Sequence, residues 1–102
     1  MNNKFLQFLG IAQKAGKLVI GYNKCEELLK KGKANLIILS KDISINSKKK
    51  FEKYSLEHNI DVVNIFWSSE LGNILGRESI KVICVVDENI GQKLKSLLIE
   101  NN

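Results

Sequence analysis

The chain has 102 residues, of which 16 are Lys or Arg and 11 are Asp or Glu, so its formal net charge is +5 at pH 7. Hydrophobic residues make up 44% and charged residues 26%, values that are typical of a folded domain and exclude wholesale disorder. No apolar run approaches the roughly 20 residues of a membrane span, and the first residues lack the apolar core of a signal peptide. We therefore expect one domain over residues 1–102, located in the cytoplasm.

The spacing of apolar residues predicts helices that alternate with strands, with glycines at several of the junctions. Helices are expected over 4–15, 24–31, 47–58, 69–75 and 88–99, and strands over 18–20, 36–39, 62–66 and 82–86. Most of the strands are continuously apolar, which is typical of a sheet that helices cover on both faces. This order predicts an α/β fold, namely a three-layer α/β/α sandwich around a four-stranded mixed sheet.

The basic residues are concentrated in the first half of the chain. Residues 1–50 carry 11 Lys and 3 acidic residues, a net charge of +8, whereas residues 51–102 carry 5 basic and 8 acidic residues, a net charge of −3. Such asymmetry indicates a basic face and a polyanionic partner. Because almost all the basic residues are Lys, and Ile and Asn are also abundant, a codon bias would produce a similar excess. Charge alone does not decide between the two explanations.

The residue types that perform catalysis or hold metals form no recognisable cluster. Cys25 and Cys84 lie far apart in the sequence and match no zinc motif, so both are expected to be buried structural residues. His58 stands alone near the end of a polar helix, where a structural or solvated role is expected. The stretch 10–18 resembles a phosphate-binding loop but has one residue too many and Leu18 in place of Ser or Thr. These observations favour a binding protein over an enzyme, with no metal or cofactor.

The segment 17–27 turns from a strand through Gly21 directly into a helix. A helix N-terminus presents unpaired N–H groups and the positive end of the helix dipole, which suits a phosphate. Gly21 would let a ligand approach the backbone closely, and Asn23 offers both a donor and an acceptor. The pattern Asn23-x-x-Glu26 also matches a capping box, so we expect Asn23 to cap the helix. Both roles are compatible.

A second segment carries a run of cations. Lys41 follows a strand, and Lys48, Lys49 and Lys50 are expected in the first turn of the next helix. A cation there interacts unfavourably with the helix dipole, which costs about 0.3–1 kcal/mol of stability for each lysine at low salt. An anion bound nearby would offset that cost. A solvated, lysine-rich surface is the alternative.

A third segment is the loop 76–81, which follows a short helix and contains Arg77, the only Arg in the chain. Arginine can bind phosphate through two hydrogen bonds or stack on a base. Phe66 and Trp67 lie at a strand end, where we expect packing in the core rather than stacking on bases.

Four pieces of sequence follow one another in the order Gly21-x-Asn23, the stretch 32–42, Leu71-Gly72-x-x-x-Gly76 and Val82-x-x-Val85. In this order they resemble the kink-turn RNA-binding ribosomal proteins of the L7Ae/L30e superfamily. The stretches 9–18 and 46–50 most resemble the short bacterial branch of that superfamily, the YlxQ-like proteins. The resemblance extends over about residues 5–98.

The resemblance implies an α/β/α sandwich that binds kinked RNA without catalysis, with a helix N-terminus in the major groove at tandem sheared G·A pairs. The family surface maps onto Gly21, Asn23, Lys24 and Glu27, and the loop 76–80 would pack against a flipped-out nucleotide. The family usually carries Glu at the position of Lys24 and Lys at that of Glu27, so the two charges are exchanged here. This exchange bears on kink-turn selectivity more than on general RNA affinity.

We therefore expect a non-catalytic monomer that binds structured RNA, either a kink-turn or ribosomal RNA, with the ribosome as a further candidate partner and no membrane association. The alternative is a protein-interaction module of the same fold with weakened or altered RNA specificity. The expected RNA-binding residues are Lys17, Gly21, Asn23, Lys24, Glu27, Lys41, Lys48, Gly76, Arg77, Ser79 and Ile80.

Overall fold

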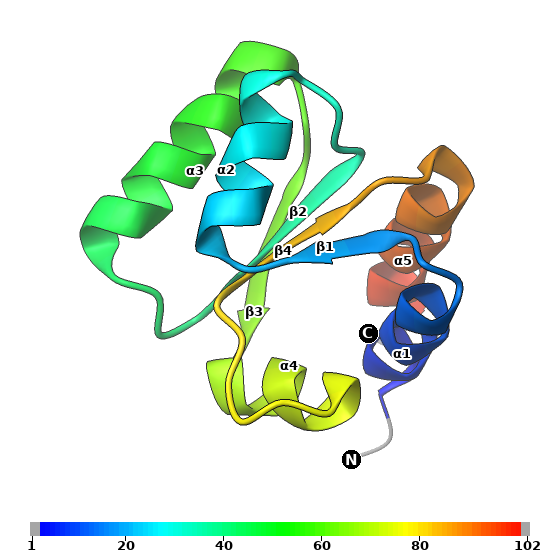
Figure 1. Ribbon diagram of the computed structural model, residues 1–102. Helices are drawn as coiled ribbons and strands as arrows, with labels where there is room; N and C mark the ends of the chain where they lie inside the picture. Colours follow the sequence, from blue (N-terminus) through cyan, green and yellow to red (C-terminus); the bar gives the residue numbers. More distant parts are fainter. Residues whose placement is uncertain (1–2, 101–102) are drawn as a thin grey trace.

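The computed structural model describes residues 3–100, and over this range helices and strands alternate (Figure 1). In chain order the elements are α1 Lys4–Lys14, β1 Leu18–Ile20, α2 Tyr22–Lys30, β2 Leu36–Ser40, α3 Ile45–His58, β3 Val62–Phe66, α4 Ser68–Leu75, β4 Val82–Val85 and α5 Glu88–Glu100. The element order agrees with the prediction. Nowhere between residues 3 and 100 is there a helix long and apolar enough to cross a membrane.

The four strands form one mixed sheet in the order β1-β4-β2-β3. Strands β2 and β3 are parallel, whereas β4 pairs antiparallel with both β1 and β2. The carboxyl ends of β1, β2 and β3 therefore meet the start of β4 at one edge of the sheet. The segments at this edge are 21–24, 41–44, 67–68 and 76–81, and together we call them the carboxyl edge.

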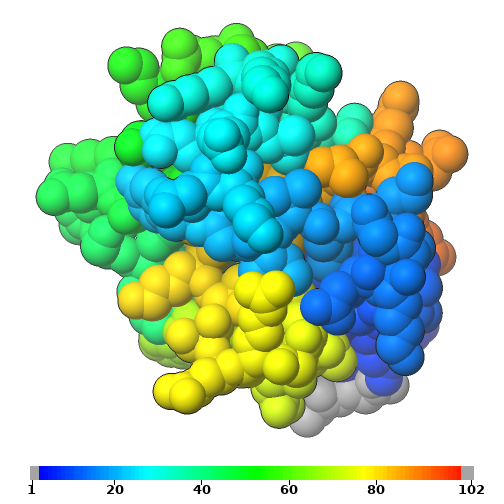
Figure 2. Space-filling model, in the orientation of Figure 1, coloured from blue at the N-terminus to red at the C-terminus, as the bar shows by residue number. Residues whose placement is uncertain are grey.

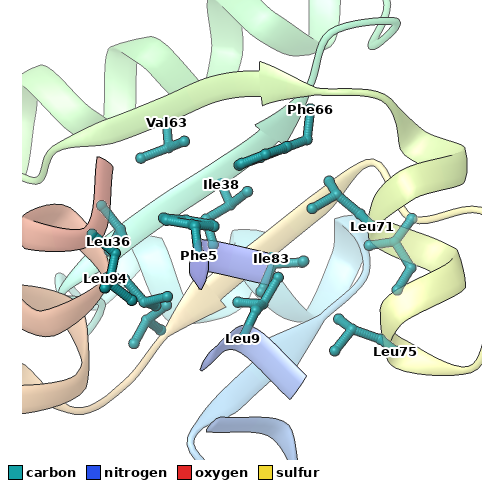
Figure 3. Packing of buried hydrophobic residues seen from close by; sticks show 13 residues of the cluster. Phe5, Leu9, Leu36, Ile38, Val63, Phe66, Leu71, Leu75, Ile83 and Leu94 are labelled. Atoms are coloured by element: carbon teal, nitrogen blue, oxygen red, sulfur yellow. The ribbon is translucent and has the colours of Figure 1, made fainter. Parts of the chain in front are cut away.

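Helices cover both faces of the sheet, which confirms the three-layer sandwich (Figure 1). The central strand β2 is buried along its whole length, and its side chains alternate between the two faces. Leu36 and Ile38 join a cluster with α1, α4 and α5, in which Phe5 and Phe66 stack at 5.1 Å (Figure 3). The opposite cluster packs α2 and α3 on the sheet and contains the buried thiols of both cysteines, as expected.

The start of α2 differs from the prediction. The helix begins at Tyr22 with Gly21 as its N-cap residue, and no side chain caps it, so the expected cap by Asn23 is wrong. The reason is tertiary: the Gly21 N–H donates to the Val82 carbonyl of β4 at 3.0 Å, and the glycine then turns the chain at once into the helix. Asn23 already lies within the first helical turn. Glu26 instead accepts a hydrogen bond from the Tyr54 hydroxyl on α3.

Helix α3 also begins earlier than predicted, at Ile45. The Ser44 hydroxyl oxygen caps it by accepting a hydrogen bond from the Ser47 N–H at 3.2 Å. The lysines that begin at Lys48 therefore lie in the second turn rather than the first. Because the dipole acts mainly within the first turn, their unfavourable interaction with it is smaller than expected.

Candidate functional site

A pocket of about 270 Å³ opens at the carboxyl edge. It joins three segments that are distant in the sequence: the turn into α2, the start of α3 and the loop between α4 and β4. Its lining residues are Ile20, Gly21, Tyr22, Ile43, Ser44, Ser47, Arg77, Ser79, Ile80, Lys81 and Val82. Figure 2 shows the same three segments, coloured light blue, green and yellow, meeting on one face of the molecule.

The backbone of Gly21 forms one wall of the pocket. Its φ of 110° and ψ of 154° lie in a region that is essentially restricted to glycine. A Cβ atom built at this position would have nothing within 4 Å, so the space in front of the turn is open. No side chain caps the first N–H groups of α2, which lie at the positive end of the helix dipole and directly follow Gly21, a lining residue of the pocket. The turn is therefore suited to bind an anionic group.

Tyr22 provides an aromatic wall, and its side chain is 38% exposed. Its ring meets the ring of Phe51 edge-on at 5.1 Å, and the Lys50 ammonium lies 5.3 Å from its centroid. Lys50 also pairs with Glu26, which lowers the pKa of the Glu26 carboxyl and raises the pKa of the Lys50 ammonium. The Tyr54 hydroxyl donates to the same carboxylate at 2.9 Å. These contacts join α2 to α3 and hold the tyrosine at the pocket wall.

The loop 76–81 forms the third wall and is fixed at both ends. At its start, Gly76 adopts a φ of 76° and the Arg77 N–H donates to the Gly72 carbonyl at 2.8 Å. At its end, the Ile80 N–H donates to the Ser68 carbonyl at 3.0 Å, and the Ile80 side chain is only 4% exposed. The side chains of residues 77–79 and 81 are exposed around this anchor. Two of them, Arg77 and Lys81, place positive charge at the pocket.

Asp42 links the end of β2 to the start of α4. Its carboxylate accepts hydrogen bonds from the Ser68 hydroxyl and from the Ser68 N–H, the latter at 2.8 Å. The hydroxyl bond, followed by the backbone bond, lowers the pKa of the Asp42 carboxyl from 3.8 to about 2. The Ser68 carbonyl also accepts a hydrogen bond from the Ile80 N–H, so the contact between Asp42 and Ser68 supports the loop 76–81.

The low pKa of Asp42 predicts an acid-dependent loss of stability. A carboxyl whose pKa is lower in the folded protein stabilises it above the unfolded pKa, and that contribution is lost as the pH falls from 3.8 to about 2. We expect Asp42→Asn to be less stable at neutral pH and to lose less further stability over this interval. Urea unfolding at neutral pH and across the interval measures both effects. Asp61→Asn, an exposed aspartate that pairs with Lys95, is the control and should retain the acid-dependent loss.

The structure brings most of the predicted site residues together. Gly21, Arg77, Ser79 and Ile80 line the pocket, and Asn23, Lys24, Lys41, Lys48 and Gly76 lie within two residues of lining positions. Glu27 is exposed one turn further along α2. Lys17 is the exception: it lies at the opposite end of β1, where its carbonyl accepts the Val86 N–H at 3.0 Å. The structure does not bring Lys17 to the pocket.

Several lining residues were not predicted from the sequence. They are Ile20, Tyr22, Ile43, Ser44, Ser47, Lys81 and Val82. Two signals could have found some of them. Tyr22 lies between the predicted Gly21 and Asn23, and Ser44 is of a residue type that commonly caps a helix and stands just before a helical segment. The apolar residues carry no such signal, because an apolar position in a strand or a connection looks the same in the sequence whether or not a pocket borders it.

The predicted environment of one aromatic residue is wrong. Phe66 is 5% exposed and packs in the core as expected, but Trp67 is 49% exposed. The chain leaves β3 between these two residues and enters α4, so the second ring is carried away from the core. The expectation that Trp67 packs in the core is therefore wrong.

The fold and this pocket define a class of protein: an α/β/α sandwich in which the N-terminus of a helix opens beside cationic and apolar walls. In the part of the chain that the structure describes, no three His, Cys, Asp or Glu side chains are grouped to hold a metal ion. The sequence model of the ribosomal protein L7Ae/L30e/S12e/Gadd45 family matches residues 3–95, so the chain belongs to this family. The family resemblance seen in the sequence is confirmed.

Individual relatives agree with this assignment. The chain is 28% identical over 95 residues to the RNA-binding protein YlxQ of Enterococcus faecium, which covers 93% of this chain and 91% of that protein. It is also 28% identical to the RNA-binding protein YlxQ of Bacillus subtilis, covering 93% and 95% of the two chains. These names confirm the resemblance to YlxQ-like proteins and agree with the prediction of a protein that is not an enzyme.

A solved structure shares the fold. A protein of unknown function from Bacillus halodurans C superimposes with a TM-score of 0.91 and is 31% identical in sequence. The match covers 96% of this chain and 99% of that one. The whole α/β/α sandwich is therefore common to both proteins.

Proposed function

We propose that the protein binds structured RNA, of the kink-turn or ribosomal type, through the N-terminus of α2 and the loop 76–81, without catalysing a reaction. Membership of a ribosomal protein family and two relatives named RNA-binding proteins support RNA as the ligand. The observation that carries the proposal is the pocket in which Gly21, the start of α3 and the cationic loop around Arg77 meet.

The lining of the pocket suits an unpaired nucleotide. Ile20, Ile43 and Ile80 offer apolar contact to a base, and three serine hydroxyls offer hydrogen bonds to its edge. Arg77 and Lys81 and the free N–H groups of α2 are placed to receive phosphates. Asn23 and Lys24 project from the first turn of the helix, where they would meet the adjoining base pairs.

A binding titration tests this proposal. We expect the protein to bind a kink-turn RNA more tightly than a variant with disrupted G·A pairs, and more tightly than a plain duplex. Affinity for all three should fall with salt, because lysines and arginine release counterions when they contact phosphates. Arg77→Ala should make the decrease of log K with log salt less steep, by about one unit of slope. Equal affinity for the three RNAs would contradict kink-turn selectivity, and an affinity independent of salt would contradict phosphate binding.

The exchanged charges on α2 lead to a separate prediction. Lys24 and Glu27 are exposed three residues apart on the same side of the helix, so Lys24→Glu/Glu27→Lys alters the charge pattern and leaves the net charge at +5. We expect this double variant to increase discrimination between the kink-turn and its G·A-disrupted form by about tenfold, since one good base contact contributes about 1–3 kcal/mol.

A charge-neutral swap elsewhere is the control for the exchanged pair. Lys53→Glu/Glu57→Lys reverses an exposed pair on α3 and should leave the discrimination unchanged. If the swap on α2 also left it unchanged, Lys24 and Glu27 would be removed from the recognition surface.

The proposal includes a single domain over 1–102 that acts in the cytoplasm as a monomer, with the ribosome as a further candidate partner and no cofactor or membrane. Recovery of partners from untreated and ribonuclease-treated lysates distinguishes it from a protein-interaction module. Partners bound through RNA disappear after ribonuclease, whereas direct protein partners remain.

A further inference from the structure

Trp67 lies at the carboxyl edge beside the pocket but is not part of its lining. About half of its side chain is exposed, and it is the only tryptophan in the chain. The ammonium group of Lys41 lies 4.8 Å from the centroid of its ring. A large aromatic surface and a positive charge are thus presented together, at the end of two neighbouring parallel strands.

Both residues are held by their backbones. The Trp67 N–H donates to the Glu70 carboxylate at 2.9 Å, and the Lys41 N–H donates to the Phe66 carbonyl at 2.7 Å. Asp42, which follows Lys41, binds Ser68, which follows Trp67. The ring and the lysine therefore sit on two segments tied together on both sides. A ligand that binds there meets a surface already in place.

The same bonds connect this surface to the pocket. The Ser68 carbonyl, one residue after Trp67, accepts the N–H of Ile80, a lining residue. Ile43, another lining residue, is two positions after Lys41. The pair thus lies just beyond the pocket wall. We expect a nucleotide next to the one in the pocket to reach this pair.

We propose that Trp67 and Lys41 form a second nucleotide-binding surface, on which an unpaired base of the bound RNA stacks against the exposed indole while its phosphate pairs with Lys41. This inference rests on the proposed function, because it places a further nucleotide of the same RNA. Every base offers a face for stacking, and a cation beside the ring adds attraction for the phosphate. The positive charges of Arg77 and Lys81 at the same edge favour a polyanion over an apolar protein segment.

The single tryptophan allows a direct test. With a kink-turn RNA as the probe, we expect binding to change the tryptophan emission of the unmodified protein and to protect it from acrylamide quenching. Trp67→Ala should weaken binding by about 5- to 100-fold, as measured by anisotropy of labelled RNA, whereas Trp67→Phe, which keeps an aromatic ring, should lose less. Lys41→Met keeps the apolar stem of the side chain. It should make the decrease of log K with log salt less steep, by about one unit of slope.

Leu56→Ala is the matched control for Trp67→Ala. Leu56→Ala removes a side chain that is 84% exposed on α3 and should leave affinity unchanged. If the protein bound RNA with unaltered emission and Trp67→Ala bound as well as Leu56→Ala, this inference would be overturned and the pocket proposal would stand. If Trp67→Ala lost only a partner that survives ribonuclease, the surface would bind protein instead. If the folded protein bound no RNA at all, both proposals would fail.

Discussion

Replacing Gly21 with alanine is expected to weaken RNA binding by about 10- to 100-fold, since a hydrogen bond to a charged group contributes about 1.5–3 kcal/mol. The backbone conformation of Gly21, with φ at 110° and ψ at 154°, costs a residue with a side chain about 1–3 kcal/mol. The added Cβ meets no protein atom within 4 Å, so it projects into the space that the RNA would occupy. Relaxing the strain would also turn the first N–H groups of α2 away from a phosphate.

Gly16→Ala is the matched control for this prediction. Gly16 also has a positive φ, 73°, with nothing within 4 Å of its Cβ position, but it lies in the turn before β1, at the other end of that strand. We expect both variants to lose stability in urea unfolding and only Gly21→Ala to lose RNA affinity. Equal RNA affinity of the two variants would show that RNA does not approach the α2 turn.

Gly72→Ala is expected to destabilise the protein and to displace the loop 76–81. A Cβ at Gly72 would lie 2.7 Å from the Arg77 carbonyl oxygen and 2.8 Å from the Glu78 carbonyl carbon and oxygen. These are backbone atoms, so the loop must move away from α4. Overpacking of this kind costs about 1–3 kcal/mol, which exceeds the gain of at most about 1 kcal/mol from the better helix propensity of alanine. Thermal unfolding measures the loss, and RNA titration should show weaker binding because Arg77 shifts.

Gly10→Ala provides the comparison for Gly72. Gly10 is also a helical glycine, in α1, but the nearest atoms to its Cβ position belong to Ile74 at 3.8 Å, an ordinary contact distance. This variant should gain stability or remain unchanged, and its RNA affinity should not alter. If Gly72→Ala behaved in the same way, close packing of the loop on α4 would not be needed for the site.

The directions of the four strands explain why the site forms at the carboxyl edge. Because β1, β2 and β3 run one way and β4 the other, four connections are gathered at one end of the sheet. Each wall of the pocket comes from a different connection, and Ser68 ties two of them together through Asp42 and Ile80. The proposed RNA surface is thus built from several short connections between helices and strands rather than from one long loop.

Much of the fold was predictable because its signals are local. The continuous apolar runs of β2 and β4 predicted a sheet covered on both faces, and both strands are buried with residues alternating between the two core clusters. The predicted start of α5 at residue 88 is also confirmed, and the Asp87 carboxylate caps this helix by accepting the Ile90 N–H at 2.9 Å. In each case the signal depends on residues a few positions apart, which periodicity and capping rules describe.

Two predictions about single residues, Asn23 and Trp67, were wrong for different reasons. Asn23 matched a capping pattern, but the hydrogen bond from Gly21 to Val82 starts α2 earlier, and Lys50 and Tyr54 occupy the carboxylate of Glu26. Trp67 is an aromatic residue at a strand end and was expected in the core, but the turn into α4 leaves it half exposed. At Asn23, partners far along the chain overrode a plausible local pattern, whereas at Trp67 the turn into the next helix did so.

The sequence by itself determined the order of helices and strands, the apolar core, the positive charge of the first half and the Gly21 turn, because each depends on composition or on neighbours in the chain. Only the tertiary structure decided which of the candidate residues share a site. It placed Arg77 and Ser79 in one pocket with Gly21, left Lys17 outside that pocket and set Trp67 against Lys41. The physical reason is that strand pairing and packing between layers, rather than distance along the chain, determine which side chains meet.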